Sequence, residues 1–439
     1  MKISSIITRS LLIILGLGVI LIIFLNIYKG PTSQLQLTDQ SPSKALIDQG
    51  AYLAQIGDCT SCHTSDTKQP FAGGVPFEMP IGTVYSPNIT PDKTHGIGNY
   101  SLEEFDNAIR YGIRKDGKSL YPAMPFPDYA VISEADIKAL YAYFMNSVQP
   151  SATPRVKAEI TWPLSMRWPL TAWRLMFSPT PKEFDTSRYP TSQIARGAYL
   201  VQGLGHCGSC HTPRSLTLNE KGYNESDPAF LSGSNVAIDG WVPINLRGDH
   251  ITGLGDISAD ELAILLWSGR SERHAVFGGM REVVDNSLQF ATKDDIISIA
   301  KYLKTLSPVN SLNPPFVYDE TTHLALSSGN DSMRGASIYL DACAACHRTT
   351  GLGYSEVFPA LAGNPSVQAD KIDSLVKIIA EGSTLHGTEH ALTTFVMPNE
   401  LNDRLNDTDI ADVLTFIRTS WGNQGKAVSL KDVQTILKH

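Results

Sequence analysis

Every cysteine in this sequence belongs to one of three copies of a short motif, Cys-x-x-Cys-His. The copies read Cys59-Thr60-Ser61-Cys62-His63, Cys207-Gly208-Ser209-Cys210-His211 and Cys343-Ala344-Ala345-Cys346-His347. Because no cysteine is left over, the motif indicates one chemistry that is repeated along the chain.

This motif is the attachment site of a c-type haem. On a helix, residues three and four apart share a face, so both thiols can reach the two vinyl groups of one porphyrin. The histidine that follows then lies over the iron as its proximal ligand. We therefore predict three covalently bound haem c groups, attached through Cys59 and Cys62, Cys207 and Cys210, and Cys343 and Cys346, with His63, His211 and His347 on the irons.

Two other interpretations use the same residue types. A Cys-x-x-Cys pair also forms a thioredoxin-like redox centre, but that chemistry does not require the histidine. Zinc takes Cys and His ligands, yet each motif offers only three of the four ligands that a structural zinc site needs. Three copies in one chain favour haem in each of them.

The motifs begin 148 and 136 residues apart (59 to 207 and 207 to 343), which predicts three tandem domains. Each motif is preceded by a similar helix start, with a glycine at position 50, 197 or 335. A middle helix ends near Gly112, Gly269 or Gly382, and a closing helix follows over 133–144, 292–303 or 406–417. Each closing helix begins with Ser, Thr or Asn and carries an acid three residues later, which is typical of a helix N-terminus.

Helix, haem motif, middle helix, loop and closing helix is the order of a class I cytochrome c domain. The predicted fold is therefore all-α. The expected layout is a signal anchor or signal peptide at 1–28, a linker at 29–45, domain 1 at 46–150, a Trp/Pro-rich connector at 151–192, domain 2 at 193–308, a linker at 309–331, domain 3 at 332–425 and a tail at 426–439.

The N-terminal segment predicts export. Lys2 and Arg9 precede an apolar run over 11–25, and no Ala-x-Ala cleavage site follows it. The run is close to the minimum of roughly 17–25 residues that a membrane-spanning helix needs. We favour an uncleaved anchor over a cleaved signal peptide, and both interpretations place the rest of the chain on the periplasmic side of the inner membrane.

The sixth iron ligands follow from elimination among nine methionines. A haem c that transfers electrons usually takes Met or a second His opposite its proximal His. Met280 and Met397 are the sole methionines between their motif and the end of their predicted domain. In the first domain Met124 lies in a proline-flanked loop at a matching distance from the middle helix, whereas Met79 comes too early and Met145 ends the closing helix.

The predicted metal ligands are therefore His63 and Met124, His211 and Met280, and His347 and Met397. The other histidines considered, which are expected at the surface, are His95, His206, His250, His274, His386 and His390. Closed coordination argues against a stand-alone haem peroxidase, which needs an open iron. It also raises the reduction potential, as suits an electron carrier.

Several longer stretches carry a family resemblance. They include Phe71-Ala72-Gly73-Gly74, Asn88-Ile89-Thr90-Pro91-Asp92, Leu120-Tyr121-Pro122-Ala123-Met124-Pro125, Ala275-Val276-Phe277-Gly278-Gly279-Met280, Trp162-Pro163-Leu164-Ser165-Met166-Arg167-Trp168-Pro169-Leu170, Phe358-Pro359-Ala360-Leu361 and Arg418-Thr419-Ser420-Trp421. From about residue 46 to 425 the sequence resembles the three-haem cytochrome c subunits of bacterial membrane-bound dehydrogenases. Within that family it resembles most the cytochrome subunit of quinohaemoprotein alcohol dehydrogenase.

The resemblance implies a division of labour. A separate periplasmic subunit that carries pyrroloquinoline quinone (PQQ) and haem would oxidise an alcohol, and this chain would pass the electrons to membrane ubiquinone. The chain would not act on the alcohol alone, and a small third subunit could complete the complex. Gluconate, sorbitol, fructose and aldehyde dehydrogenases, which use flavin or molybdenum, have similar subunits and form the alternative.

Charge and composition fit this assignment. The formal net charge of −8, without a basic stripe, gives no sign of a nucleic-acid partner. Residues 161–177 hold three of the six tryptophans, flanked by Arg167 and Arg174. Such a segment either packs between domains, docks a partner or contacts the membrane surface.

Overall fold

The computed structural model describes residues 2–36, 41–399 and 401–437. Residues 37–40 of the predicted first linker and the last two residues of the predicted tail lie outside this description. Over the described residues the chain is mostly helical, as the sequence predicts, with two short antiparallel strand pairs that we did not predict. The chain divides into two compact units, residues 1–54 with 59–184, and 55–58 with 185–439.

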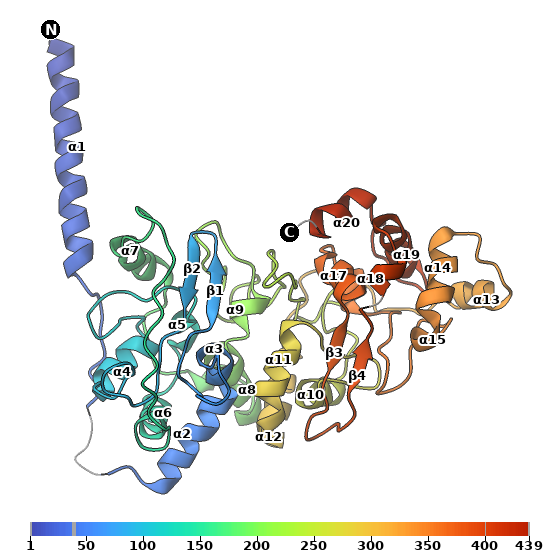
Figure 1. Ribbon diagram of the computed structural model, residues 1–439, viewed down its shortest axis with the longest axis horizontal. Helices are drawn as coiled ribbons and strands as arrows, with labels where there is room; N and C mark the ends of the chain where they lie inside the picture. The colour runs from blue at the N-terminus through green and yellow to red at the C-terminus, as the bar shows by residue number, and fades with distance from the viewer. Residues whose placement is uncertain (1, 37–40, 400, 438–439) are drawn as a thin grey trace. The chain divides into compact units, whose positions relative to one another are not determined.

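Unit 1 contains a long N-terminal helix and a set of short helices around one strand pair (Figure 1). Its elements are α1 (Lys2–Ile27), α2 (Lys44–Ile56, whose last two residues fall in unit 2), α3 (Cys59–His63), β1 (Pro76–Met79), β2 (Gly82–Tyr85), α4 (Leu102–Ile109), α5 (Phe126–Tyr129), α6 (Glu134–Asn146) and α7 (Trp168–Phe177).

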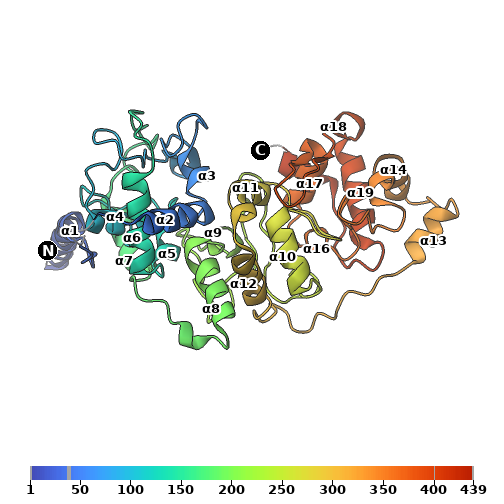
Figure 2. The same cartoon turned by 90° about the horizontal axis from the view of Figure 1, so that it is seen from below.

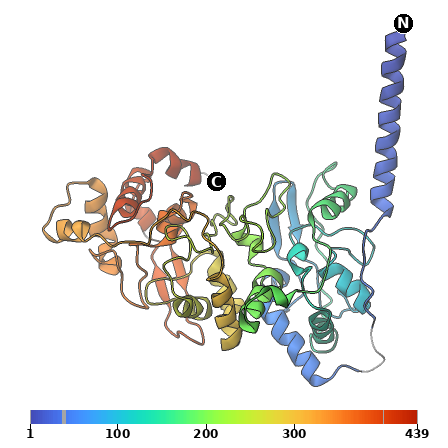
Figure 3. The same ribbon diagram turned by 180° about the vertical axis from the view of Figure 1, so that it is seen from behind.

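Helix α1 projects from the rest of unit 1 (Figure 3). Residues 9–27 are long and apolar enough to cross a membrane, and almost all of their side chains are exposed. The end of α1 contacts α7, which lies in the Trp-rich connector. Leu25 is buried there, and the buried Arg174 donates a hydrogen bond of 2.5 Å to the carbonyl of Lys29.

The regular elements of unit 2 are helices apart from the strand pair formed by β3 and β4 (Figure 1). Its elements are η1 (Thr186–Arg188), α8 (Ser192–Tyr199), the π-helical turn η2 (Leu200–Leu204), α9 (Gly208–His211), α10 (Ala259–Ser268), α11 (Gly279–Asn286), η3 (Leu288–Phe290), α12 (Lys293–Leu303), α13 (Thr321–Ser327), α14 (Arg334–Ala342), α15 (Ala344–His347), α16 (Pro365–Gln368), α17 (Asp373–Glu381), β3 (Ser383–Leu385), β4 (Phe395–Met397), α18 (Leu401–Arg404), α19 (Asp407–Thr419) and α20 (Leu430–Leu437).

The three closing helices begin where the sequence places them. Helices α6, α12 and α19 have Ser133, Thr292 and Asn406 as their N-cap residues, and each cap side chain accepts a hydrogen bond from a backbone amide in the first turn. These bonds satisfy donors that a helix N-terminus would otherwise leave unpaired.

Each closing helix passes very close to the helix that precedes a motif, and the closest approach is at a glycine. A Cβ atom added to Gly197 would lie 1.9 Å from the carbonyl oxygen of Ser298 on α12. The corresponding distance is 1.9 Å between Gly50 and the Ala139 oxygen, and 2.2 Å between Gly335 and the Asp412 oxygen. Only glycine allows these backbones to touch, because any side chain would push them apart.

The residue before each of these glycines bonds the acid in the first turn of the closing helix. Arg196 forms a bidentate ion pair with Asp295, with both N–O distances 2.8 Å. Arg334 bonds Asp409 through one guanidinium nitrogen, and its Nε lies 3.3 Å from Asp412 on the same helix. Gln49 donates a 2.9 Å hydrogen bond to Asp136. The first-turn acid, predicted from helix-dipole chemistry, therefore also ties two helices together.

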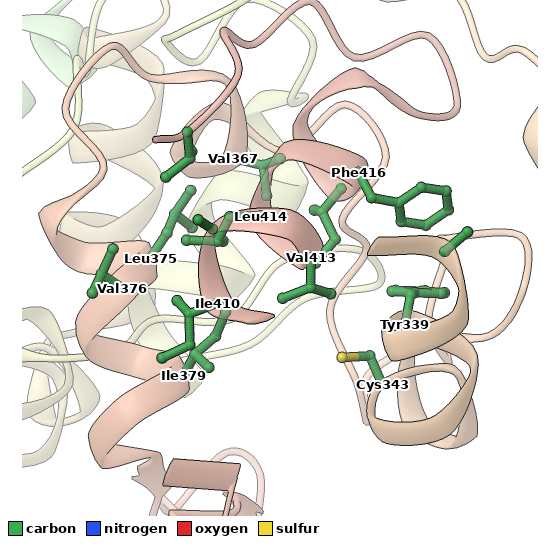
Figure 4. Packing of buried hydrophobic residues seen from close by; sticks show 14 of the residues in the cluster. Tyr339, Cys343, Val367, Leu375, Val376, Ile379, Ile410, Val413, Leu414 and Phe416 are labelled. Carbon is green, nitrogen blue, oxygen red and sulfur yellow. The ribbon is translucent and has the colours of Figure 1, made fainter. Parts of the chain in front are cut away.

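The core of residues 326–433 is a single cluster to which α14, α17 and α19 contribute many of the side chains (Figure 4). Tyr339, Val376 and Val413 have no exposed surface. Figure 4 also shows Cys343 one helical turn from Tyr339 at the edge of this core. The first cysteine of the third motif is thus part of the hydrophobic packing.

Two segments predicted as linker and tail are more structured than expected. The 309–331 segment starts as an extended chain after α12 and then forms α13 (Figure 2). Residues 430–437 form α20, which packs on α17 and α19 and buries Val433 completely.

Candidate haem sites

All three motifs form a single helical turn. The turns are α3, α9 and α15, and each ends at the motif histidine. Cys210 is exposed, Cys343 is buried and the other four cysteines are half-buried. The helical turn places the two cysteines and the histidine of a motif on one short element, as the haem-attachment chemistry requires.

The three proximal histidines are held in the same way. The Nδ1 atom of His63 lies 2.9 Å from the carbonyl oxygen of Pro87, that of His211 lies 2.7 Å from Ile244, and that of His347 lies 3.0 Å from Pro359. A carbonyl only accepts hydrogen bonds, so Nδ1 carries the proton in each ring. Nε2 then keeps its lone pair, and it is this atom that can bind iron.

Burial lowers the pKa of His63, His211 and His347, because it disfavours the charged imidazolium form. The hydrogen bond to the carbonyl raises the pKa, but the effect of burial is larger. All three rings are therefore biased toward the neutral form, which is the form that ligates a metal.

The thiol of Cys343 is unlike that of a redox centre. Burial raises its pKa to about 12. Thioredoxin-like centres depend on a lowered thiol pKa, because the thiolate is the nucleophile. The third site therefore fits covalent attachment of a group better than dithiol exchange.

The three predicted methionine ligands follow a similar backbone feature. In each case a glycine with a positive φ angle follows the middle helix and begins a turn in the segment before the methionine. Gly112, Gly269 and Gly382 all have positive φ angles, between 62° and 82°. Leu120 then donates to the Gly112 carbonyl at 2.8 Å, and Val276 donates to the Gly269 carbonyl at 2.9 Å. After Gly382, strands β3 and β4 pair so that Ser383 lies opposite Met397.

Each of the three methionines is half-buried. Met124 lies in a tight loop in which its amide donates to the Tyr121 carbonyl at 3.3 Å and its carbonyl accepts from Phe126 at 2.9 Å. Met280 is in the first turn of α11, and Met397 ends β4. Met79, which we did not predict as a ligand, is the last residue of β1 and lies opposite Gly82.

The remaining histidines considered contact groups outside the motifs. His250 lies 2.6 Å from Asp256 and His274 lies 3.0 Å from Glu261. His206 lies 3.0 Å from the Leu204 carbonyl. His386 and His390, in the loop before Met397, both reach toward residues that follow Met280.

Sequence reasoning missed the carbonyl groups that hold the proximal histidines. They lie 24, 33 and 12 residues after their histidine, so no constant spacing reveals them. A weak signal exists, because Pro87 and Ile244 are each followed by an asparagine whose side-chain oxygen accepts a backbone amide two residues on. In the third copy an alanine follows Pro359, so the signal is lost.

Haem c fits these residues. Each motif supplies two cysteines on one helical turn and a neutral imidazole whose Nδ1 is already engaged by a backbone carbonyl. Within residues 2–36, 41–399 and 401–437, no three His, Cys, Asp or Glu side chains are grouped so that they could hold a metal ion.

Comparison with known proteins gives the family. A family model described as cytochrome c matches residues 332–421. The gluconate 2-dehydrogenase cytochrome c subunit of Pantoea cypripedii is 49% identical over 412 residues, which cover 93% of each chain. The alcohol dehydrogenase (quinone) cytochrome c subunit of Gluconacetobacter polyoxogenes is 50% identical over 382 residues, or 87% of this chain and 81% of the relative.

A more distant relative has a third substrate in its name. The fructose dehydrogenase cytochrome subunit of Gluconobacter japonicus is 33% identical over 434 residues, which cover 95% of this chain and 87% of the relative. Shared membership at these identities implies covalently bound haem c and a catalytic dehydrogenase subunit as partner. This chain belongs to the family of cytochrome c subunits of bacterial dehydrogenases.

Proposed function

We propose that this chain is a three-haem electron-transfer subunit built from three class I cytochrome c domains, at 46–150, 193–308 and 332–425. The observation that carries the proposal is the threefold recurrence of one constellation. Each copy has a motif turn, an imidazole Nδ1 bound by a carbonyl and a glycine pressed against the closing helix.

In each domain the chain's residues would divide the work of holding one haem c. The two cysteines of the motif would fasten the haem, the motif histidine would bind iron through Nε2, and Met124, Met280 or Met397 would supply the second protein ligand. When bound, haem c supplies a reversible one-electron couple, and His/Met ligation raises its potential. The lowered pKa of the three motif histidines would favour the neutral imidazole that iron requires.

We propose that the donor is a periplasmic PQQ-dependent alcohol dehydrogenase subunit and that the acceptor is membrane ubiquinone. The support is the 50% identity to a subunit named for a quinone-linked alcohol dehydrogenase. The alternative donor is a gluconate dehydrogenase subunit, favoured by the 49% identity that extends over 93% of the chain.

We also propose that α1 is a retained membrane anchor rather than a cleaved leader. The support is the packing of the residues that follow it. Ser33 and Leu35 are buried, and the Ser33 amide donates a 2.8 Å hydrogen bond to Asn107. The Lys29 carbonyl also accepts a hydrogen bond from Arg174, so the segment directly after α1 is part of the fold of unit 1.

The Trp-rich connector then lies where the anchor leaves the membrane. Its inner side packs on unit 1, since Trp173 makes an edge contact with Phe126 at 6.1 Å between ring centroids. Its outer side exposes large apolar side chains, namely Trp162, Leu164, Met166, Leu175 and Met176. We propose that this outer side contacts the lipid headgroup region, where Trp is preferred.

Two measurements test the function. Intact mass of the mature protein should show three attached haems, and replacing Cys207 and Cys210 together with alanine should remove one. The native complex, purified in detergent, should then reduce a ubiquinone analogue with ethanol as donor. Reduction with gluconate but not with ethanol would replace the alcohol assignment, and fewer than three haems would overturn the three-domain proposal.

A further inference from the structure

The loop between β3 and β4, residues 386–394, leads directly to Met397 and makes few bonds of its own. Within it, Thr388 and Ala391 exchange two backbone hydrogen bonds, of 3.0 and 3.2 Å, and the Gly387 amide bonds the Thr394 hydroxyl at 3.1 Å. Most of its residues are exposed. Its conformation therefore depends on what it contacts elsewhere in unit 2.

Those contacts are made with residues 267–291, the segment that carries Met280. His390 lies flat against Trp267, with 3.8 Å between ring centroids and 32° between ring planes. Its Nε2 lies 2.9 Å from the carbonyl oxygen of Gln289 and must donate to it. Trp267 is itself fixed, because its indole N–H donates to the Ala291 carbonyl at 3.0 Å.

Further bonds hold the rest of the loop. Thr388 is 3% exposed, and its hydroxyl donates to the Ser268 carbonyl at 3.3 Å. Arg270 donates to the Thr393 carbonyl at 2.8 Å, and its guanidinium lies 4.6 Å from the centre of the Phe395 ring. Phe395 begins β4, so this contact acts two residues before Met397.

Residues 267–291 also contact the segment that supports His347. The Arg273 carbonyl accepts a 2.9 Å hydrogen bond from the amide of Ala360. Ala360 follows Pro359, whose carbonyl holds Nδ1 of His347. Residues 267–291 thus contact both the support of the proximal histidine and the loop of the distal methionine.

A pocket of about 470 Å³ lies between the two ligand segments. Gly279, next to Met280, lines it from one side, and Met397 lines it from the other. The two predicted distal ligands therefore belong to chain segments that face a common space.

We infer that residues 267–291 position Met397 opposite His347, with His390 and Arg270 as the positioning residues, so that the second and third haem sites form one coupled pair. This inference rests on the proposed function, because it needs haem at both sites. A loop that is tied at His390, Thr388 and Thr393 holds its methionine in one place. Once those ties are removed, the thioether moves away from the iron.

The test is the full-length, haem-loaded protein with His390→Ala and Arg270→Ala combined. We expect three haems by mass and a loss of about one third of the near-infrared band of Met-ligated ferric haem. We also expect a lower potential for one haem, because Met ligation raises it, and carbon monoxide binding at that haem in the reduced protein. His95→Ala, in unit 1, is the matched control and should leave all three readouts unchanged.

Single variants keep the inference testable if the combined variant loses haem. His390→Gln retains an N–H donor for the Gln289 carbonyl and should rescue most of the band, whereas His390→Ala should not. A full band and unchanged potentials in both His390→Ala and Arg270→Ala would overturn the inference while leaving the proposed function intact. Fewer than three haems in the unmodified protein would instead overturn the proposed function.

Discussion

At the scale of single residues, the sites depend on what lies behind each ligand as much as on the ligand. His63, His211 and His347 are each turned by a backbone carbonyl that leaves Nε2 for the iron. Because the acceptor in each bond is a backbone carbonyl, replacing the side chain of Pro87, Ile244 or Pro359 does not remove that acceptor. We therefore expect the imidazole orientation to tolerate substitution, and the proposed methionine side to be where a single substitution would open the iron.

Replacing Met280 with leucine tests this directly. Leucine has nearly the volume of methionine but no lone pair, so the fold should persist while one iron loses its sixth ligand. We expect the reduced Met280→Leu protein to bind one carbon monoxide per molecule and the unmodified protein to bind almost none. Met145→Leu, at the end of α6, is the control. Stoichiometric binding by the unmodified protein would show a vacant iron.

Asp249 gives a pH prediction at the same scale. Burial alone would raise its pKa, but hydrogen bonds from the amides of Thr252 and Ile251 and from the side chain of Asn313 lower it below the ordinary value. The stabilisation is therefore complete above about pH 3.9 and is lost as the pH falls through the lower folded value. The unmodified protein should lose stability steeply in that range.

In Asp249→Asn this acid dependence should flatten, because asparagine has no charge to titrate. At pH 7 the variant should lose roughly 2 kcal/mol, since a charged acceptor of several buried donors is gone. Thermal unfolding as a function of pH measures both effects. Asp341→Asn is the control, because this exposed carboxylate pairs with Arg404 at the surface, where an ion pair contributes little. Equal pH profiles for the unmodified protein and Asp249→Asn would contradict the prediction.

At the scale of elements, the helix crossings are the shared structural device. Helix α8 packs on α12 and α14 packs on α19, each with a glycine at the point of contact. The N-cap and the first-turn acid fix where the closing helix begins, and the glycine fixes how closely the other helix approaches. Together they set the position of the motif turn that follows.

Gly197→Ala should therefore be costly. The added methyl would lie 1.9 Å from the Ser298 oxygen, so one helix must move. Overpacking of this kind costs about 1–3 kcal/mol, and we expect a lower unfolding temperature for unit 2. Gly279→Ala is the steric control, since nothing lies within 4 Å of its added Cβ. Equal losses in both variants would show that the helix crossing is not the cause.

The connector gives a second prediction for an element. Trp162 is 79% exposed and Met176 is 68% exposed, so replacing both with serine should leave the unfolding temperature nearly unchanged. The same change should weaken retention on phospholipid vesicles after α1 is removed by truncation. Trp173→Ser should do the reverse and reduce stability, because Trp173 packs between Phe126 and Phe177. Unaltered vesicle retention in the Trp162 and Met176 variant would contradict lipid contact.

At the scale of the whole molecule, the chain belongs to a family whose members are named for different substrates. Relatives at 49% and 50% identity are named for gluconate and alcohol dehydrogenases. In the function proposed above, the substrate binds to the partner and this chain receives only electrons, so such similar subunits could serve different reactions. Discrimination between donors would lie in the docking surface rather than in the haem sites.

Features that depend on residues close together in the chain could be predicted from the sequence. The motifs, the N-caps Ser133, Thr292 and Asn406 and the apolar N-terminal helix are set by residues within one or two turns of each other. The predicted haem ligands remain a prediction of the same local kind. Local patterns are visible in sequence because their partners are neighbours in the chain.

Contacts between distant residues were decided only by the tertiary structure. No spacing reveals that Pro359 holds His347, that Arg196 pairs with Asp295 or that His390 stacks on Trp267. The strand pair β3–β4 and the order of the 309–331 segment were missed for the same reason. These features are stabilised by contacts between residues that are far apart in the chain. The sequence around each residue does not indicate which distant residue it will contact.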